Sequence, residues 1–210
     1  MFVLFFSYSA LIPPQNFGYV ETDLYRSAIP DEMNFSFLQT LNLKTVVYLS
    51  LDEPAQLFSE FLKEQGIELV QINVGEPGIN GQIISPQIVL DAFHIMLDPE
   101  RYPVIVMCNL GRHRTGTVIG CLRRLQLWSL SSIVDEFRRY TGQKQSAIHE
   151  QFIELFDTEL VEMPKDASKL PFKIRPKHIF SADAQIPLHQ NIPLNQGKSM
   201  DFLSETKNHI

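Results

Sequence analysis

The sequence holds only two cysteines, Cys108 and Cys121, among its 210 residues. Small secreted domains that lack a large core are held together by several disulfide bonds, and two cysteines cannot supply such a framework. His94 and His149 have no metal-ligand spacing around them. We therefore expect a cytoplasmic protein, in a reducing compartment, with no metal and no cofactor.

Positive charge is also scarce, because 24 Asp and Glu side chains outnumber 18 Lys and Arg side chains. The formal net charge of −6 argues against a general nucleic-acid-binding surface, so nucleic acid is not expected as a partner. An anionic ligand would therefore have to be captured by positive charge that is concentrated at one place.

The apolar start of the chain is too short to cross a membrane as a helix. It is led by Phe2-Val3-Leu4-Phe5-Phe6, no basic segment precedes it, and Ala10-Leu11-Ile12-Pro13-Pro14 is a poor site for signal-peptide cleavage. We interpret residues 1–11 as an N-terminal apolar extension without a membrane span. Association of this segment with a membrane is the less favoured alternative.

The middle of the chain alternates between strand and helix patterns. The patterns predict a small opening hairpin over residues 17–20 and 24–27. Further strands are predicted over 45–49, 68–73 and 103–106. Helices are predicted over 34–41, 57–66, 86–97, 118–125, 131–137 and 148–156. Such alternation predicts an α/β fold with a central, mostly parallel sheet flanked by helices. Ligands bind at the carboxyl ends of the strands in such sheets.

Three segments follow from this pattern: the extension 1–11, a domain over 12–161, and a tail over 162–210. The tail has scattered Pro, Asn, Gln, Ser and Lys without a sustained period, which indicates an extended or disordered segment. Within it, the apolar residues of 171–174 could still dock on the domain.

The most informative stretch starts at the apolar run 104–107, which ends in Cys108. A loop that carries Gly111 follows, then Arg114 and Thr115, then a helical pattern. A cysteine followed at the sixth position by arginine is the arrangement that holds a phosphate dianion over a thiolate. Arg114 has a planar fork that can bind two phosphate oxygens, and Gly111 permits close backbone approach.

The thiolate is the reactive form of cysteine, and the pKa of a free thiol is about 8.5, which a helix N-terminus lowers. We predict that the N–H groups of a loop wrap around the phosphate as an anion nest. The expected roles are Cys108 as nucleophile, Arg114 as clamp, and Thr115 as a hydrogen-bond donor to the sulfur when it leaves the phosphoenzyme. The predicted phosphate-binding residues are Asn109, Leu110, Gly111, Arg112 and His113.

A plainer interpretation exists for each of these residues. A cysteine near an arginine is usually a buried thiol beside a surface charge, and the strand before and the helix after the loop are what favour a phosphate site. We expect Cys121 to be a buried small residue, with a disulfide to Cys108 as the alternative. Trp128 is expected in the core. Solvated helix faces are expected for Arg123, Arg124, Arg138, Arg139 and Lys144, and the alternative for the last three is the rim of a polyanion site.

The loop 108–116, Cys-Asn-Leu-Gly-Arg-His-Arg-Thr-Gly, resembles the active loop of the plant-and-fungal atypical dual-specificity phosphatases. Residues 16–20 and 24–30 resemble the opening motif of that family, and 151–156 resembles its closing helix. The similarity covers about residues 12–161. Within the family it is greatest to the fungal oxidant-induced cell-cycle arrest branch of tyrosine-protein phosphatases.

The resemblance implies a cysteine-phosphatase fold and a phosphocysteine intermediate, with Cys108 as nucleophile and Arg114 as phosphate clamp. Family members cleave inositol pyrophosphates, and some act on phosphotyrosine or phosphoinositides. The loop departs from the family pattern in two places. Met107 stands where the family has histidine, and Leu110 stands where relatives often have arginine. Arg112 keeps a basic residue where lysine is common.

A carboxylic acid on a neighbouring loop is needed to protonate the leaving oxygen of a phosphate ester. Glu76 is the first choice, because its glycine-rich loop follows a strand and can reach the site. Asp52, Glu53 and Asp91 are the other candidates, and each could equally be a solvated charge.

The sequence thus favours a cysteine phosphatase whose substrate is a phosphorylated small molecule or a phosphoprotein. The alternative is a catalytically weak or inactive subunit that binds a phosphorylated ligand in a complex of related phosphatases, which Met107 motivates. A rhodanese-like sulfur carrier also places a cysteine in a loop after a strand, but the Arg114-Thr115 ending argues against it.

Overall fold

The computed structural model describes residues 10–74, 84–142 and 146–174. Within these residues, five strands form one sheet in the order β1-β2-β5-β3-β4. Their bounds are β1 Gly18–Glu21, β2 Leu24–Ala28, β3 Thr45–Leu49, β4 Glu68–Ile72 and β5 Val104–Cys108. Only the β1–β2 pair is antiparallel in the described sheet, so the predicted mostly parallel α/β architecture is confirmed.

The two central strands are buried along their whole length, which explains their continuous apolar composition. All five residues of β3 and all five of β5 are buried, as expected for parallel strands covered on both faces. The predicted opening hairpin is present, and its second strand also pairs with β5 in parallel. This pairing places Ala28 opposite Cys108.

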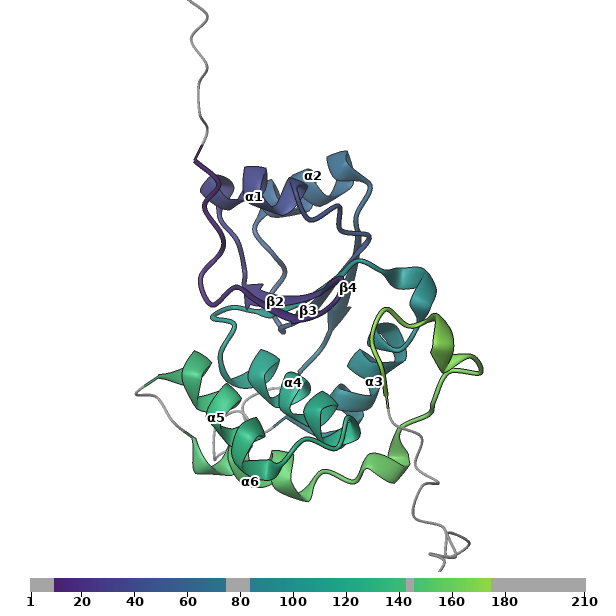
Figure 1. The fold of residues 1–210 in the computed structure, drawn as a ribbon. Coiled ribbons are helices and arrows are strands. Elements are labelled where there is room, and N and C mark those ends of the chain that lie inside the picture. Colours follow the sequence, from purple (N-terminus) through teal and green to yellow (C-terminus); the bar gives the residue numbers. More distant parts are fainter. Residues whose placement is uncertain (1–9, 75–83, 143–145, 175–210) are drawn as a thin grey trace, which may run out of the picture. The chain divides into compact units, whose positions relative to one another are not determined.

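Helices cover both faces of the sheet (Figure 1). On one face lie α1 Phe35–Gln39 and α2 Gln56–Gln65, and on the other lie α3 Pro86–Met96, α4 His113–Leu125, α5 Leu130–Thr141 and α6 Ala147–Leu155. Single 3-10 turns occur at η1 Glu32–Asn34, η2 Pro99–Arg101, η3 Thr158–Leu160 and η4 Ala167–Lys169. The apolar side chains accordingly form two clusters, one on each side of the sheet.

The strand β5 contributes to both clusters because its side chains alternate between the two faces. Val104, Val106 and Cys108 belong to the cluster beneath α3–α6. Ile105 and Met107 belong to the cluster beneath α1 and α2.

The packed core extends beyond the predicted domain end at residue 161. Leu170 and Phe172 are buried in the larger cluster, and the Phe172 ring lies edge-on to Tyr102 at a centroid distance of 6.1 Å. Apolar burial therefore holds part of the predicted tail against the domain. Residues 175–210 of that tail and residues 1–9 of the predicted extension lie outside the described residues.

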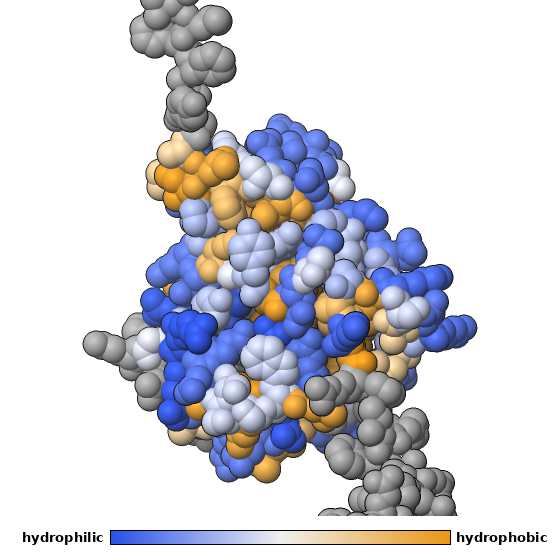
Figure 2. Space-filling view, viewed as in Figure 1, coloured by the Kyte–Doolittle hydropathy of each residue, from blue (hydrophilic) through white to orange (hydrophobic). Residues whose placement is uncertain are grey.

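The described surface is mostly hydrophilic on the face that Figure 2 draws. Apolar residues form smaller patches there, one of them near the described start of the chain, where Leu11 and Ile12 are exposed. Among the described residues, no helix combines the length and apolar character that crossing a membrane requires.

The expectation that Arg123 lies on a solvated helix face is wrong, because the residue is only 3% exposed. Its guanidinium donates to Glu136 at 2.9 Å from Nε, to Glu21 at 2.5 Å from Nη1, and to the Val20 carbonyl at 2.8 Å from Nη2. Trp128, which was expected in the core, is 43% exposed and stacks on Arg123 at 4.2 Å from the ring centroid. The side chains of Arg123, Glu21, Glu136 and Trp128 thus form a polar cluster that links α4, α5 and the hairpin.

Replacing Arg123 should therefore destabilise the fold. We expect Arg123→Met to lower the free energy of unfolding by about 3 kcal/mol, because it leaves two partly buried carboxylates without their partner. Chemical denaturation monitored by circular dichroism measures this loss. Arg139→Met, at an exposed position of α5, is the matched control and should change stability by less than about 0.5 kcal/mol. Equal stabilities of the two variants would contradict a stabilising role for the polar cluster around Arg123.

Candidate active site

Cys108 is the last residue of β5, and its side chain is only 4% exposed. Its carbonyl accepts a hydrogen bond from the Ile29 N–H at 2.9 Å and one from the Gly111 N–H at 3.3 Å. The first bond continues the parallel pairing with β2, and the second closes the turn that follows the cysteine. The position of the thiol is therefore set by the sheet and by the loop together.

The loop can form only because Gly111 lacks a side chain. Its φ is +62°, and a Cβ atom there would lie 2.5 Å from the backbone of Ser27 and Ala28. Both observations exclude other residues, since a positive φ is costly for them and the neighbouring atoms belong to a backbone in the sheet. The predicted close approach at Gly111 is thus an approach to β2.

Two side chains from the N-terminal hairpin region hold the loop carbonyls. Asn16 Nδ2 donates to the Leu110 carbonyl at 2.7 Å, and Arg26 Nη2 donates to the Gly111 carbonyl at 2.9 Å. Carbonyls that are held by donors at the back of a loop leave its N–H groups to face a ligand. The sequence reasoning missed both residues, although both lie in the segments that carry the family's opening motif.

Asn109 is fixed from the opposite side, by β3 and the residue after it. Its Oδ1 accepts hydrogen bonds from the Tyr48 hydroxyl at 3.0 Å and from Ser50 Oγ at 3.1 Å. Ser50 Oγ in turn accepts from the Asp52 N–H at 3.2 Å. The Asn109 side chain therefore anchors the loop to the sheet.

The helix α4 begins at the end of the loop, and its first turn points toward the pocket. The Gly116 N–H donates to the Arg112 carbonyl at 2.7 Å, so the N–H groups that precede it have no intrahelical acceptor. Arg114 Nη1 lies 3.4 Å from the Leu49 carbonyl, in a partly buried position. The arginine fork therefore lies at the end of β3 and lines the same pocket as Cys108, and its role as phosphate clamp stays a prediction.

A pocket of about 170 Å³ opens over the cysteine. Cys108, Asn109, Leu110, Arg112, His113 and Arg114 line it. The structure thus brings together six of the residues predicted for the site, and the described lining includes two arginines and no carboxylate. Positive charge and helix N–H groups make this pocket suitable for an anion of the size of phosphate.

Thr115 lies in the first turn of α4 and is fully buried, and its hydroxyl has no hydrogen-bond partner among the described residues. The donation to the cysteine sulfur is therefore not made in this structure and stays a prediction. His113 stacks on His149 from α6 at a centroid distance of 5.0 Å, and Phe137 lies close to both rings. His113 therefore packs against α5 and α6 in addition to lining the pocket.

Met107 is fully buried in the apolar cluster beneath α1 and α2. Its side chain lies on the other face of the sheet from Cys108, because successive strand residues alternate. Cys121 is fully buried in α4, and desolvation raises the pKa of its thiol. Both cysteines are free, so the alternative of a disulfide between them is not realised.

The candidates for the general acid separate in the structure. Glu76 lies outside the described residues. Asp52 is exposed and is linked through Ser50 to the loop residue Asn109. Asp91 accepts a hydrogen bond from Gln87 at 2.8 Å.

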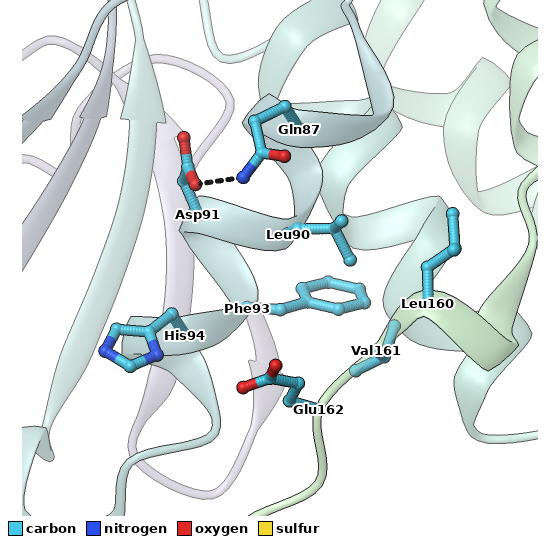
Figure 3. A pocket seen from close by; sticks show the side chains of 8 residues that line it. All are labelled: Gln87, Leu90, Asp91, Phe93, His94, Leu160, Val161 and Glu162. Carbon is cyan, nitrogen blue, oxygen red and sulfur yellow. Dashed lines mark hydrogen bonds between the residues drawn. The ribbon is translucent and has the colours of Figure 1, made fainter.

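Asp91 lines a second cavity, of about 320 Å³, between α3 and the segment around η3 (Figure 3). His94 and Glu162 lie at its far end, and none of the residues that line it belongs to the pocket over Cys108. Asp91 is therefore poorly placed to protonate a leaving group at the cysteine. No cluster of three or more potential metal ligands occurs within 10–74, 84–142 and 146–174.

The comparisons with known proteins agree with this geometry. The tyrosine phosphatase family matches residues 11–174. The OCA1 protein of Mycosarcoma maydis, whose name places it among the tyrosine-protein phosphatases, is 51% identical over 152 residues, which cover 72% of this chain and 96% of that protein. Inositol diphosphatase DSP4 of Arabidopsis thaliana is 39% identical over 149 residues, covering 70% of this chain and 74% of the relative.

A solved structure is also similar. The core catalytic domain of the PP-IP phosphatase SIW14 from S. cerevisiae, crystallised with citrate, matches with a TM-score of 0.66 and 43% sequence identity. The match covers 70% of this chain and 89% of that domain. The family match and the shared fold lead to one conclusion: this chain belongs to the tyrosine phosphatase family, in the group that includes the fungal OCA1 proteins and the inositol diphosphatases.

Proposed function

We propose that this protein is a cysteine-dependent phosphatase that removes a phosphate from inositol pyrophosphates through a phosphocysteine. The observation that carries the proposal is the pocket that Cys108, Arg112 and Arg114 line at the start of α4. The substrate class comes from relatives named as inositol diphosphatases or as a PP-IP phosphatase. Phosphotyrosine remains the second substrate class, because the OCA1 relatives are named for it.

The reaction uses groups that the structure places around the pocket. The Cys108 thiolate attacks the terminal phosphorus, and a sulfur–phosphorus bond forms as the bond to the bridging oxygen breaks. Arg114 and the N–H groups of the loop hold the equatorial oxygens, where charge is concentrated in the transition state. The leaving inositol phosphate carries the electron pair away, and water then attacks the phosphocysteine, which releases phosphate and restores the thiolate.

An anhydride suits this site in one further respect. Its leaving group is a phosphate, a far weaker base than an alkoxide, so its departure needs less help from a general acid. No carboxylate lines the pocket among the described residues. We propose Glu76 as the acid, as the sequence suggested, with Asp52 as the described alternative.

Replacing the nucleophile tests the chemistry directly. We expect Cys108→Ser to lower kcat at least about 10³-fold, because removing the nucleophile leaves only binding and electrostatic stabilisation. Phosphate release is measured with inositol pyrophosphates, phosphotyrosine peptides and phosphoinositides, and phosphate affinity is measured by calorimetry and should persist. Cys121→Ser, at a buried thiol outside the pocket, is the control and should keep its activity.

The same panel decides between an enzyme and a phosphate-binding subunit of a complex. Turnover of any substrate class by the wild type, lost in Cys108→Ser, supports the phosphatase. Binding of phosphorylated ligands without turnover would contradict it and favour the subunit, whose partners would then be related phosphatases.

Gly111 should matter for activity far more than a glycine of similar backbone conformation elsewhere. We expect Gly111→Ala to lower kcat/KM about 100-fold, because the loop must shift by about 1 Å to clear β2. Gly66→Ala is the matched control, since Gly66 also has a positive φ, of +67°, but has no atom within 4 Å of its Cβ position. It should lose stability and keep kcat/KM, and equal activity losses in both variants would contradict the assignment.

The general acid can be identified by comparing two kinds of substrate. We expect Glu76→Gln to lower kcat on a phosphotyrosine peptide by about 100-fold and to affect an inositol pyrophosphate much less, because only the phenolate needs the proton. The pH dependence of kcat should lose its alkaline limb in that variant. Asp52→Asn and Glu53→Gln test the alternatives after β3, and Asp91→Asn, in the separate cavity, is the control. If Asp52→Asn alone shows this pattern, the assignment to Glu76 is wrong.

The cytoplasm, predicted from the two cysteines, is the compartment that we propose. From the resemblance to the atypical dual-specificity phosphatases, we also propose related phosphatase subunits as protein partners. Cell fractionation of the full chain would test the compartment, and affinity purification would test the partners.

A further inference from the structure

Arg26 is a buried cation directly behind the phosphate-binding loop. It lies in β2, one strand away from the cysteine, in register with Val106 of β5. Only 1% of its side chain is exposed. Strand alternation puts it on the same face as Cys108, because the residue two positions on, Ala28, is the partner of Cys108.

The guanidinium touches both the loop and the helix that follows it. Arg26 Nη2 donates to the Gly111 carbonyl at 2.9 Å. The same nitrogen would lie 3.6 Å from a Cβ atom at Gly116, in the second turn of α4. The ring of Tyr140 covers the other side, with its centroid 3.6 Å from Arg26 Cζ. The cation is therefore enclosed between the loop, α4 and α5.

The positive charge of Arg26 is not balanced by a carboxylate. No ion pair of Arg26 occurs among the described residues, and its Nε and Nη1 atoms have no hydrogen-bond partner there. The carboxylate of Glu136, in α5, attracts the Arg26 guanidinium electrostatically, but it accepts a hydrogen bond from Arg123 Nε at 2.9 Å. A buried charge without a partner costs several kcal/mol, so its retention calls for a compensating role.

The charge persists at neutral pH in spite of that cost. Burial lowers the pKa of Arg26 to about 10, while Tyr140, Glu136 and Cys108 act in the opposite direction. An anion at Cys108 would lie on the same face of the sheet as this charge and one strand away from it, because Arg26 pairs with Val106 and Ala28 pairs with Cys108. Met107, in the position where the family has histidine, points to the other face of the sheet and supplies no charge.

We propose that Arg26 is a positioning residue that stabilises the Cys108 thiolate with its buried positive charge and holds the Gly111 carbonyl in the phosphate-binding conformation of the loop. This inference rests on the proposed function, because it assigns a task in activating the same cysteine. The residue acts from behind the loop and does not touch the substrate.

The test measures the reactivity of the thiol rather than turnover. Alkylation of Cys108 by iodoacetamide is followed by intact mass as a function of pH, with Cys108→Ser reporting any reaction at Cys121. Arg26→Gln removes the charge and keeps a polar side chain, whereas Arg26→Lys keeps the charge. We expect Arg26→Gln to slow alkylation at pH 7 about tenfold and to reach the wild-type rate at high pH. Arg26→Lys should stay within about threefold of the wild type.

The other charged and titratable groups around Arg26 and Cys108 are unchanged in these variants. They come from the loop and α4, from α5, from α6 and from β3: Arg112, His113, Arg114, Arg123, Glu136, Tyr140, His149 and Tyr48. Arg101→Met is the matched control, because Arg101 pairs with Glu68 and precedes the first residue of β5, whereas Cys108 is its last. It should keep the alkylation profile of the wild type.

Identical profiles for Arg26→Gln and the wild type would overturn the proposal, and so would equal slowing in Arg26→Gln and Arg101→Met. If Arg26→Gln does not fold, Tyr140→Ala, at a half-buried position, exposes the guanidinium to water and should slow alkylation at pH 7 about threefold, because water screens the charge. An unchanged profile in Tyr140→Ala would then overturn the proposal. A wild type that alkylates as expected but releases no phosphate from any substrate would count against the proposed function alone.

Discussion

The approach of Gly111 to the backbone of β2 is the contact on which the rest of the site depends. A side chain at this position would meet the backbone of Ser27 and Ala28 at 2.5 Å, so the loop can lie against the sheet only with glycine there. The loop then fixes three things together. It sets the start of α4, the direction of the N–H groups in front of that helix, and the position of Cys108 at the end of β5. Our proposal that the loop binds an anion rests first on this backbone arrangement, before any charged side chain is considered.

The supports of the loop come from both sides of β5, because β5 lies between β2 and β3 in the sheet. Arg26 and Asn16 hold carbonyls from one side, and Tyr48 and Ser50 hold Asn109 from the other. A site built in this way is preorganised, since its donors need no rearrangement when charge develops on a bound phosphoryl group. It also explains how an acidic chain can bind an anion. The positive charge is local, and Arg26, Arg112 and Arg114 carry it.

The two faces of the sheet differ in the residues that they carry. The face beneath α3–α6 carries the cysteine, the helix that follows the loop, and the buried arginines. The face beneath α1 and α2 is an apolar cluster to which Met107 belongs. Met107 therefore packs in an apolar cluster and contributes no charge. In our proposal, the charge that stabilises the thiolate comes from Arg26, on the other face of the sheet.

The sequence by itself determined the elements with strong periodicity, the mostly parallel sheet, and the loop from Cys108 to Thr115. It could do so because apolar patterning and the cysteine-to-arginine spacing are local properties of the chain. Only the tertiary structure decided which distant residues support the loop. Arg26 precedes Gly111 by 85 positions, and a lone arginine in a short strand carries no signal that it is buried. Arg123 was assigned to a solvated face for the same reason, since an arginine near the end of a helix is usually exposed. Leu170 and Phe172 lie in a segment without regular periodicity, and only their packing against the core shows that the fold continues past residue 161.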